Sequence, residues 1–120
     1  MRVKNKKTYY LKIKTIIEDD EGGKYPGYSA PIEIKANISP ASGKLQAEIY
    51  GERLNYILNM LVDGPYKVIV KENITYYVID GIELCEGSGV CVYSSKDKDP
   101  DYKIISIKPY SHLFIELEKI

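Results

Sequence analysis

The stretch PIEIKANISPASGKLQAEIYGE, residues 31–52, contains two runs in which apolar and polar side chains alternate. The apolar members are Ile32, Ile34, Ala36 and Ile38 in the first run, and Leu45, Ala47 and Ile49 in the second. A period of two is typical of a strand that buries one face. We therefore predict a strand on each side of a break at residues 39–44.

The same alternation recurs on both sides of this stretch, between segments rich in Gly, Pro, Asn and Asp. Further strands are expected at residues 8–17, 66–71, 74–79, 89–93, 102–108 and 113–117. Residues 18–30 and 94–101 are interpreted as long loops, the first with a turn at Pro26-Gly27. Residues 52–62 fit either a short helix or a strand, and the neighbouring strands favour a strand.

Seven to nine short, mostly antiparallel strands with frequent turns and long loops predict an all-β fold, either a barrel or a sandwich. A length of 120 residues suits one domain, here residues 1–120. The 12 Tyr and the recurring Ile and Val favour pleated surfaces. Within this domain, residues 1–7 are expected to form a flexible basic N-terminus.

The charges balance overall but are segregated along the chain. Lys plus Arg and Asp plus Glu number 17 each, which argues against a dedicated nucleic-acid binder. The first 14 residues carry six positive charges and no acid, and the acidic run Glu18–Glu21 follows. The two runs are either ordinary solvated surface or the opposite faces of a ring subunit. The chain also lacks an apolar run of membrane-spanning length and a signal-peptide core, so we expect no membrane association and synthesis in the cytoplasm.

Cys85 and Cys91 flank the sequence Glu-Gly-Ser-Gly-Val. Their spacing differs from that of a zinc knuckle or a C-x-x-C redox pair, and the chain has one His, His112. We favour a turn at Gly87–Gly89 with both cysteines as small apolar residues on its arms. A disulfide across the turn is geometrically possible but is disfavoured in a reducing cytosol.

No catalytic constellation is evident. His112 has no nucleophile motif beside it, and Gly87-Ser88-Gly89 lacks the third glycine of a dinucleotide fingerprint. Asp97, Asp99 and Asp101 alternate but lack the glycine and distal glutamate of a calcium loop. We therefore expect neither an enzyme nor a metal or cofactor site. The tyrosines on expected strands suit the core or an interface, or else the base-stacking platform of an OB-like module that binds single-stranded nucleic acid.

Several motifs of residues 31–120, taken in order, resemble the small head-closure or head–tail connector proteins of long-tailed phages and prophages of Gram-positive bacteria. These motifs are PIEIKANISPASG, AEIYG, a Tyr-x-x-x-Met at Tyr56–Met60, EGSGVCVY, PDYKIISIK and IELEKI. Each motif is built of strand and turn residues, so the resemblance depends on their order and spacing together. The hairpin at residues 66–79 looks like an insertion relative to shorter family members.

The resemblance implies a small β-barrel fold and a structural virion protein without catalytic activity or cofactor. Copies of such a protein form a ring below the portal and its adaptor, close the DNA-filled capsid and dock the tail. The expected partners are the chain itself, the portal or adaptor, a tail-side connector or tail terminator, and packaged DNA without sequence specificity. The expected location is the neck of the virion. A tail-side connector is the nearest rival to head closure within this class.

Two sets of residues become candidate sites under this resemblance. The candidate channel-facing loop comprises Ser39, Pro40, Ala41, Ser42, Gly43 and Lys44, with Gln46 and Glu48 on its arms. The candidate partner-docking loops comprise Glu18, Asp19, Asp20, Glu21, Lys96, Asp97, Lys98 and Asp99. The 18–30 and 94–101 loops also compete with residues 39–48 for the channel-facing role.

Overall fold

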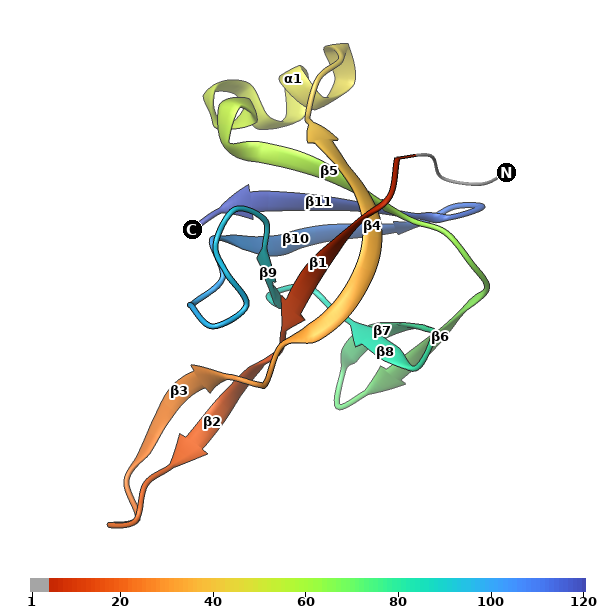
Figure 1. The fold of residues 1–120 in the computed structure, drawn as a ribbon. Coiled ribbons are helices and arrows are strands. Elements are labelled where there is room, and N and C mark those ends of the chain that lie inside the picture. The colour runs from red at the N-terminus through yellow and green to blue at the C-terminus, as the bar shows by residue number, and fades with distance from the viewer. Residues whose placement is uncertain (1–4) are drawn as a thin grey trace.

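The computed structural model describes residues 5–120, and six of the strands in this range close into an antiparallel barrel (Figure 1). The barrel strands are β1 (Lys7–Lys12), β4 (Ile32–Pro40), β5 (Ile57–Val62), β9 (Gly89–Cys91), β10 (Tyr102–Pro109) and β11 (Leu113–Lys119). Their order around the barrel is β1-β4-β5-β11-β10-β9. The predicted small all-β barrel is therefore confirmed.

Alternating side chains fill the inside of the barrel. Its fully buried members include Leu11, Ala36, Met60, Leu113, Ile115 and Leu117. They come from β1, β4, β5 and β11, so residues distant in sequence meet in one core. A register shift between Ile104 and Ser106 of β10 adds a bulge opposite β11. Such a bulge bends a strand and helps a sheet to close on itself.

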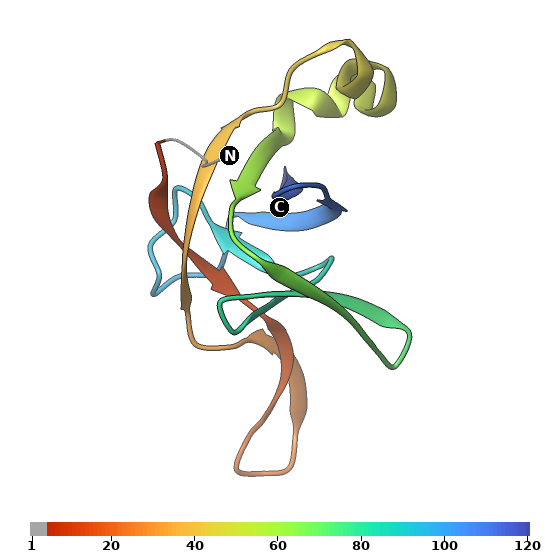
Figure 2. The ribbon, with the colours of Figure 1, turned by 90° about the vertical axis from the view of Figure 1, so that its right-hand side faces the viewer.

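Three smaller units project from this barrel (Figures 1 and 2). They are a two-stranded ribbon of β2 (Lys14–Glu18) and β3 (Lys24–Tyr28), a sheet of β6 (Tyr66–Lys71), β7 (Ile74–Ile79) and β8 (Ile82–Leu84), and the helix α1 (Lys44–Tyr50) followed by a 3-10 helix (Gly51–Tyr56). In both views α1 lies at the top of the molecule and the ribbon at the bottom. The chain therefore has two different protrusions at opposite ends of one barrel.

The expected strand at residues 8–17 is divided between the barrel and the ribbon. The division falls at Ile13, whose backbone N–H donates to Ser29 Oγ at 3.0 Å and whose carbonyl accepts from the Ser29 N–H at 2.8 Å. The segment stays extended but changes partners, from β4 and β9 to β3. Divisions of this kind explain why the structure has more strands than the seven to nine expected.

The prediction that residues 18–30 form a long loop was wrong, because β3 pairs with β2 and only a short turn joins them. Pro26 and Gly27, expected to mark a turn, lie within β3. Proline is tolerated here because β3 is an edge strand, where an N–H on the open side is dispensable. Gly27 leaves room for Ile17, whose Cγ1 would lie 2.8 Å from a Cβ at residue 27.

The prediction of a strand at residues 45–50 was also wrong, since these residues form α1. Leu, Gln, Ala and Glu all have high helix propensity, and they dominate the sequence KLQAEIY. A short run of alternating apolar residues fits either a strand or a helix. Here the helix propensity of the residues and their contacts in the folded protein favour the helix. At residues 52–62 both alternatives hold in part, because the 3-10 helix ends at Tyr56 and β5 begins at Ile57.

The predicted hairpin at residues 66–79 is present as β6 and β7. Its two turn residues, Glu72 and Asn73, both have positive φ, at 51° and 66°. Two successive residues with positive φ form the turn type that matches the twist of an antiparallel pair. The C-terminal strands β10 and β11 also match their predicted positions closely.

We expect Gly89→Ala to lower the free energy of unfolding by about 1–3 kcal/mol, the usual range for overpacking. Gly89 is buried in β9, and a Cβ there would lie 2.7 Å from Cβ of Pro100. The proline ring is too rigid to move aside. Denaturant unfolding of Gly89→Ala, Pro100→Gly and Gly89→Ala/Pro100→Gly measures the effect, because glycine at residue 100 removes both ring atoms that the new Cβ would meet. If Gly89→Ala costs as much stability in the Pro100→Gly background as in the wild type, the proline contact is not its cause.

Candidate interaction surfaces

Helix α1 turns Gln46 and Tyr50 toward the barrel and its large apolar side chains toward solvent. Gln46 and Tyr50 are four residues apart and half-buried, whereas Leu45 and Ile49 are 70% and 57% exposed. This reverses the usual arrangement, in which the apolar stripe of a helix faces the core. The helix contributes no buried residue to the fold. Its outer face is therefore a candidate docking surface.

A buried carboxylate holds α1 against the barrel. Glu116 of β11 points outward from the barrel but is only 1% exposed. Its Oε2 accepts a hydrogen bond from Gln46 Nε2 at 2.9 Å, and its Oε1 pairs with the Lys108 ammonium at 2.9 Å. Gln46 Nε2 also donates to Asn59 Oδ1 at 2.7 Å. Next to this network, Arg53 forms a two-pronged ion pair with Glu118.

The network changes the acidity of its members. Burial acts to raise the pKa of Glu116, but hydrogen bonds from Gln46, Lys108 and Tyr50 and the Lys108 charge outweigh it and leave the pKa below its usual value. For Tyr50, burial, its hydrogen bond to Glu116 and the charge of that carboxylate raise the pKa to about 12. Glu116 is therefore ionised, and Tyr50 is a neutral donor, at neutral pH.

We expect acid to weaken this attachment of α1. The folded pKa of Glu116 lies below the unfolded one, so its contribution is present above the usual value of 4.5 and is lost as the pH falls through the folded pKa. Denaturant unfolding between pH 7 and pH 3 should show a steeper loss of stability for the wild type than for Glu116→Gln, which lacks this titration. Parallel pH curves would contradict this assignment.

Two glycines mark the ends of α1. Gly43 has a φ of 105° and Gly51 a φ of 56°, and both would be strained by a side chain. Between α1 and the barrel wall lies an open hollow of about 420 Å³. It is lined by Ser42, Gly43, Lys44, Leu45, Gln46, Asn59, Lys108, Tyr110 and Phe114. The hollow extends the apolar surface of Leu45 toward Tyr110, which is 61% exposed.

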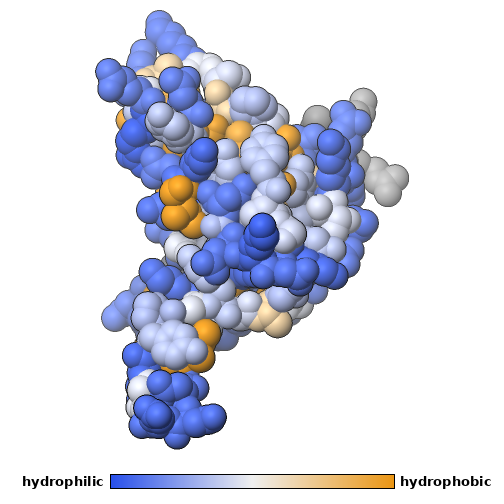
Figure 3. All heavy atoms as spheres, turned by 60° about the vertical axis from the view of Figure 1, so that its left-hand side comes forward, coloured by the Kyte–Doolittle hydropathy of each residue, from blue (hydrophilic) through white to orange (hydrophobic). Residues whose placement is uncertain are grey.

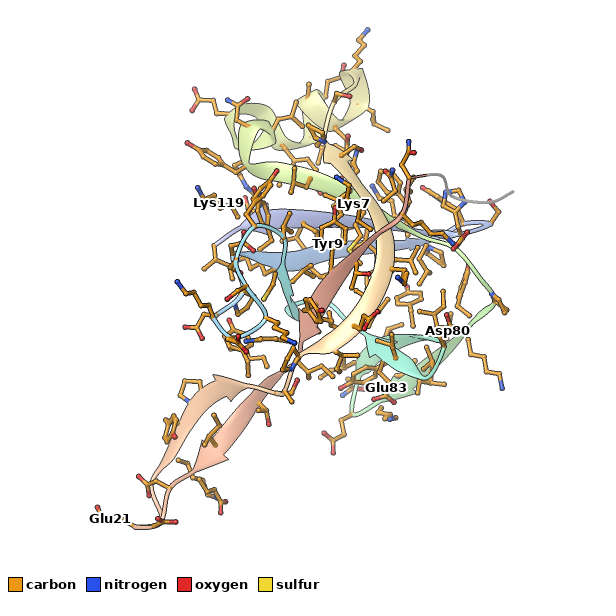
Figure 4. The ribbon with its side chains drawn as sticks, viewed as in Figure 1. Lys7, Tyr9, Glu21, Asp80, Glu83 and Lys119 are labelled. Atoms are coloured by element: carbon orange, nitrogen blue, oxygen red, sulfur yellow. The ribbon has the colours of Figure 1, made fainter. Side chains whose placement is uncertain are left out.

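The tip of the ribbon is acidic and lies far from α1. Figure 3 shows a hydrophilic tip with apolar surface just above it, and Figure 4 places Glu21 at this end. Asp19 shapes the turn, because its Oδ1 accepts from the N–H groups of Glu21 and Gly23 at 3.0 and 2.6 Å. The Lys24 ammonium lies 3.5 Å from the Glu18 carboxylate, and the side chains of both residues are well exposed. The tip therefore presents concentrated negative charge.

The 94–101 segment is fastened to the side of the barrel. Asp101 accepts from the N–H groups of Val92 and Tyr93 at 2.8 and 2.9 Å. The buried Lys12 donates to the Lys98 carbonyl at 2.5 Å. These bonds leave Lys96, Asp97, Lys98 and Asp99 exposed on the outside of the segment. The role of Lys12 could not be predicted from the sequence, because its partner Lys98 is 86 residues away along the chain.

Tyrosines gather beside this segment. Tyr93 is 79% exposed, and its ring meets that of Tyr102 edge-on at a centroid distance of 6.2 Å. Burial, followed by the proximity of Tyr93, raises the pKa of Tyr9 and of Tyr102. The Lys96 ammonium lies 5.8 Å from the centre of the Tyr10 ring. Aromatic and basic side chains therefore share one surface of the barrel.

The β6–β7–β8 sheet is only partly supported by the barrel. Ile79 and Leu84 are buried in the core, whereas Val68 and Val70 are 52% and 67% exposed. Lys71 of β6 pairs with Glu83 of β8 at 2.6 Å. A cleft of about 440 Å³ lies at the hairpin turn, lined by Asn73, Ile74, Thr75, Tyr77, Cys85, Glu86 and Ile107. The outer part of this sheet is thus accessible on several sides.

The structure separates the two sets of candidate site residues. Ser39 and Pro40 are the last residues of β4, Ala41, Ser42 and Gly43 form a short connection, and Lys44, Gln46 and Glu48 lie on α1. Gln46 and Glu48 were expected on a strand, and the helix corrects that placement. The loops at residues 18–21 and 96–99 lie on the ribbon tip and on the barrel side, respectively, away from α1 (Figure 1).

Cys85 and Cys91 are both free thiols, with Cys91 buried in β9. The Ser88 N–H donates to the Cys85 carbonyl at 3.3 Å, which closes the turn expected between them. Within residues 5–120, no three His, Cys, Asp or Glu side chains are placed to share a metal ion, and no helix is long and apolar enough to span a membrane. Arg2 and Lys4 of the expected basic N-terminus lie outside the described residues, whereas Lys6 pairs with Asp63 at 3.2 Å.

Comparison of the chain with protein-family models, with curated protein sequences and with solved structures returns no match.

Proposed function

We propose that this chain is a structural subunit of a phage head–tail connector, where copies form a ring that closes the filled head and docks the tail. The observation that carries the proposal is the placement of two chemically different protrusions at opposite ends of one barrel. A connector must bind one protein on its head side and another on its tail side. The ordered motifs of residues 31–120 support the same function.

The two ends suit two kinds of partner. The α1 end offers exposed Leu45 and Ile49 beside the hollow, which fits an apolar surface such as a groove between helices. The ribbon tip offers Glu18–Glu21, which fits a basic surface and favours fast, salt-sensitive docking. We propose that these ends face the portal or adaptor and the tail-side proteins, one each. Residues 39–48 then lie on the α1 face of the ring.

Imaging of particles tests this function. The host expresses the capsid, portal, adaptor and tail genes that accompany this gene, with the gene present or deleted. Deletion should give heads that leak DNA together with free tails, because the ring closes the head and joins it to the tail. Full heads that still carry tails after deletion would overturn the proposal.

Variants at the two ends sharpen the test, and each is the control for the other. Leu45→Asp/Ile49→Asp alters only exposed side chains of α1, and Asp20→Lys/Glu21→Lys alters only exposed side chains of the tip. We expect the two variants to fail at different joints, one giving leaking heads with no bound ring and the other giving sealed heads without tails. Failure of both at the same joint would contradict the assignment of opposite faces.

The tyrosine surface favours a second candidate, an OB-like module that binds single-stranded nucleic acid. Tyr93 is exposed enough to stack on a base, and Lys96 and Lys98 are close in sequence. This function predicts salt-dependent binding of a fluorescent oligonucleotide that Tyr93→Ala weakens by about 1–3 kcal/mol, the usual value of one stacked base. Absence of binding at low salt would exclude this candidate.

A further inference from the structure

The ribbon joins the barrel at two chain crossings. β1 passes into β2 at Ile13, and β3 leads back to β4 through residues 29–31. Two hydrogen bonds between Ile13 and Ser29, at 3.0 and 2.8 Å, mark the line along which the ribbon leaves the barrel. Hinges commonly form at such junctions, where a few residues at the ends of elements absorb a change of backbone angles. The orientation of the ribbon therefore depends on what contacts its root.

We call residues 94–101 the strap, because they lie across the outer face of β1 and β9. In Figure 1 the strap is the blue loop between β9 and β10, beside β1 and above the ribbon. Lys12, the last residue of β1, is 8% exposed, and its ammonium donates to the Lys98 carbonyl at 2.5 Å. The same carbonyl lies 3.9 Å from the Cys91 thiol of β9. The strap is thus fixed to the barrel wall at the point where the ribbon begins.

The strap also reaches the root of the ribbon. Pro100 is buried against Gly89 of β9, where an added Cβ would lie 2.7 Å from Cβ of the proline. The same point lies 3.4 Å from Cε1 of Tyr28, the last residue of β3. Tyr28 is half-buried there. The strap and the ribbon therefore pack against one glycine of the barrel.

We propose that the strap fixes the angle at which the ribbon leaves the barrel, with Tyr28 and Lys12 as positioning residues. Tyr28 makes the contact from the ribbon, and Lys12 acts through the strap by holding it on the barrel wall. The inference rests on the proposed function, because it names what aims the acidic tip at the protein it docks. A protrusion held in its bound orientation loses less conformational freedom on docking, so it binds more tightly.

The burial of Lys12 supports this assignment. Lysine is almost never fully buried, because removing its ammonium from water is costly unless a hydrogen-bond acceptor replaces the water. Here the Lys98 carbonyl is that acceptor, so the buried ammonium and the closed strap stabilise each other. Lys14, the next lysine along the chain, stays exposed on the ribbon. Lys14 therefore offers a matched control for Lys12.

Distances between spin labels test the proposal on the full chain. The labels are attached to Glu21→Cys at the ribbon tip and to Ser111→Cys in the turn between β10 and β11, both exposed positions. The native thiols are removed by Cys85→Ser and Cys91→Ala. Pulsed electron paramagnetic resonance then gives the distribution of distances from tip to barrel. We expect a single narrow peak for this parent protein, and a broad distribution would overturn the proposal.

Variants at the root of the ribbon should broaden that distribution. We expect broadening for Tyr28→Ala and for Lys12→Met, and a narrow peak in either variant would overturn the role of that residue. Tyr25→Ala, on the exposed part of β3, and Lys14→Met are the matched controls and should keep the narrow peak. Leu117→Ala lowers stability in the core instead. Broadening there would show that the tip follows overall stability rather than the strap, and would overturn the proposal.

Cys91 reports whether Lys12 acts through the strap. Its thiol is 2% exposed beneath the Lys98 carbonyl, so alkylation in Cys85→Ser protein measures how often the strap opens. We expect Lys12→Met to raise the alkylation rate about tenfold, as for the loss of one hydrogen bond to a charged group. A broadened tip distance with an unchanged alkylation rate would overturn this role of Lys12. Leu117→Ala should leave the rate unchanged, and an equal rise there would mean that Cys91 reports unfolding of the whole chain, which also overturns it.

The outcomes also separate the strap from the proposed function. Heads that lose closure or tails on gene deletion, together with narrow peaks in Tyr28→Ala and Lys12→Met, would overturn the role of the strap and leave the connector function standing. Broadened peaks in both variants, together with full and tailed heads after gene deletion, would support the role of the strap and overturn the connector function.

Discussion

Lys108→Met is expected to lower the free energy of unfolding by about 2–3 kcal/mol at neutral pH, because it leaves a buried carboxylate without its cation. Glu116 is 1% exposed, so water cannot replace the ammonium group. Two considerations keep the loss below that of a fully buried pair. The Lys108 side chain is itself 34% exposed, and Gln46 still donates to Glu116 in the variant. Methionine keeps most of the apolar stem of Lys108 but removes its ammonium group, which also lies 5.6 Å from the centre of the Phe114 ring.

The double variant Lys108→Met/Glu116→Leu is the matched control. Replacing both members of a buried ion pair by apolar side chains is often neutral or stabilising, so we expect it to recover most of the loss. Denaturant unfolding of the three proteins at pH 7 gives the comparison. A double variant as unstable as Lys108→Met would show that the lost cation is not the cause. The double variant should also loosen α1, which loses its hydrogen bonds to Glu116.

We expect Leu117→Ala to lower the free energy of unfolding by about 3–4 kcal/mol, within the range for leucines deleted from a packed core. Leu117 is fully buried in β11, between Ile104 of β10 and Leu58 of β5. The cavity lies within a closed ring of strands, which can shift little to refill it. Urea unfolding measures the loss, and the exposed Ile120→Ala is the control, with almost no expected effect. A loss below about 1 kcal/mol would mean that the barrel collapses around the missing atoms.

The strands of the barrel could be predicted from the sequence because the pattern that marks each of them lies within a few neighbouring residues. Alternation with a period of two marks the longer strands of the barrel, and it is clearest in β4, where Ile34 and Ala36 are buried and Glu33 and Lys35 are exposed. The turn at Glu72-Asn73 could also be predicted from the sequence, and in the structure these two residues of positive φ join β6 and β7. In such segments the residue pattern and the final environment agree, so the sequence is sufficient.

The protrusions were harder to predict because their signals conflict or are distant. In β3, Pro26 and Gly27 are ordinary turn residues, and only pairing with β2 makes them part of a strand. Leu45 and Ile49 read as the buried face of a strand, but they lie exposed on a helix. Glu116 reads as the solvent side of β11, and its burial follows from the arrival of α1 about 70 residues earlier in sequence. In these candidate interaction surfaces apolar side chains are exposed and a carboxylate is buried, so the alternation that predicts the barrel strands does not predict them.

The direct passage of β1 into β2, and of β3 into β4, has a mechanical consequence. A pull on the ribbon tip loads the C-terminal end of β1 and the N-terminal end of β4 at once, since these strands are antiparallel neighbours. Both strands then have to slide along β9 and β5, which flank them on their other sides. Sliding breaks many hydrogen bonds together, whereas peeling would break them one at a time. The ribbon is thus anchored to bear tension, which would matter wherever stored pressure pushes on one side of the molecule.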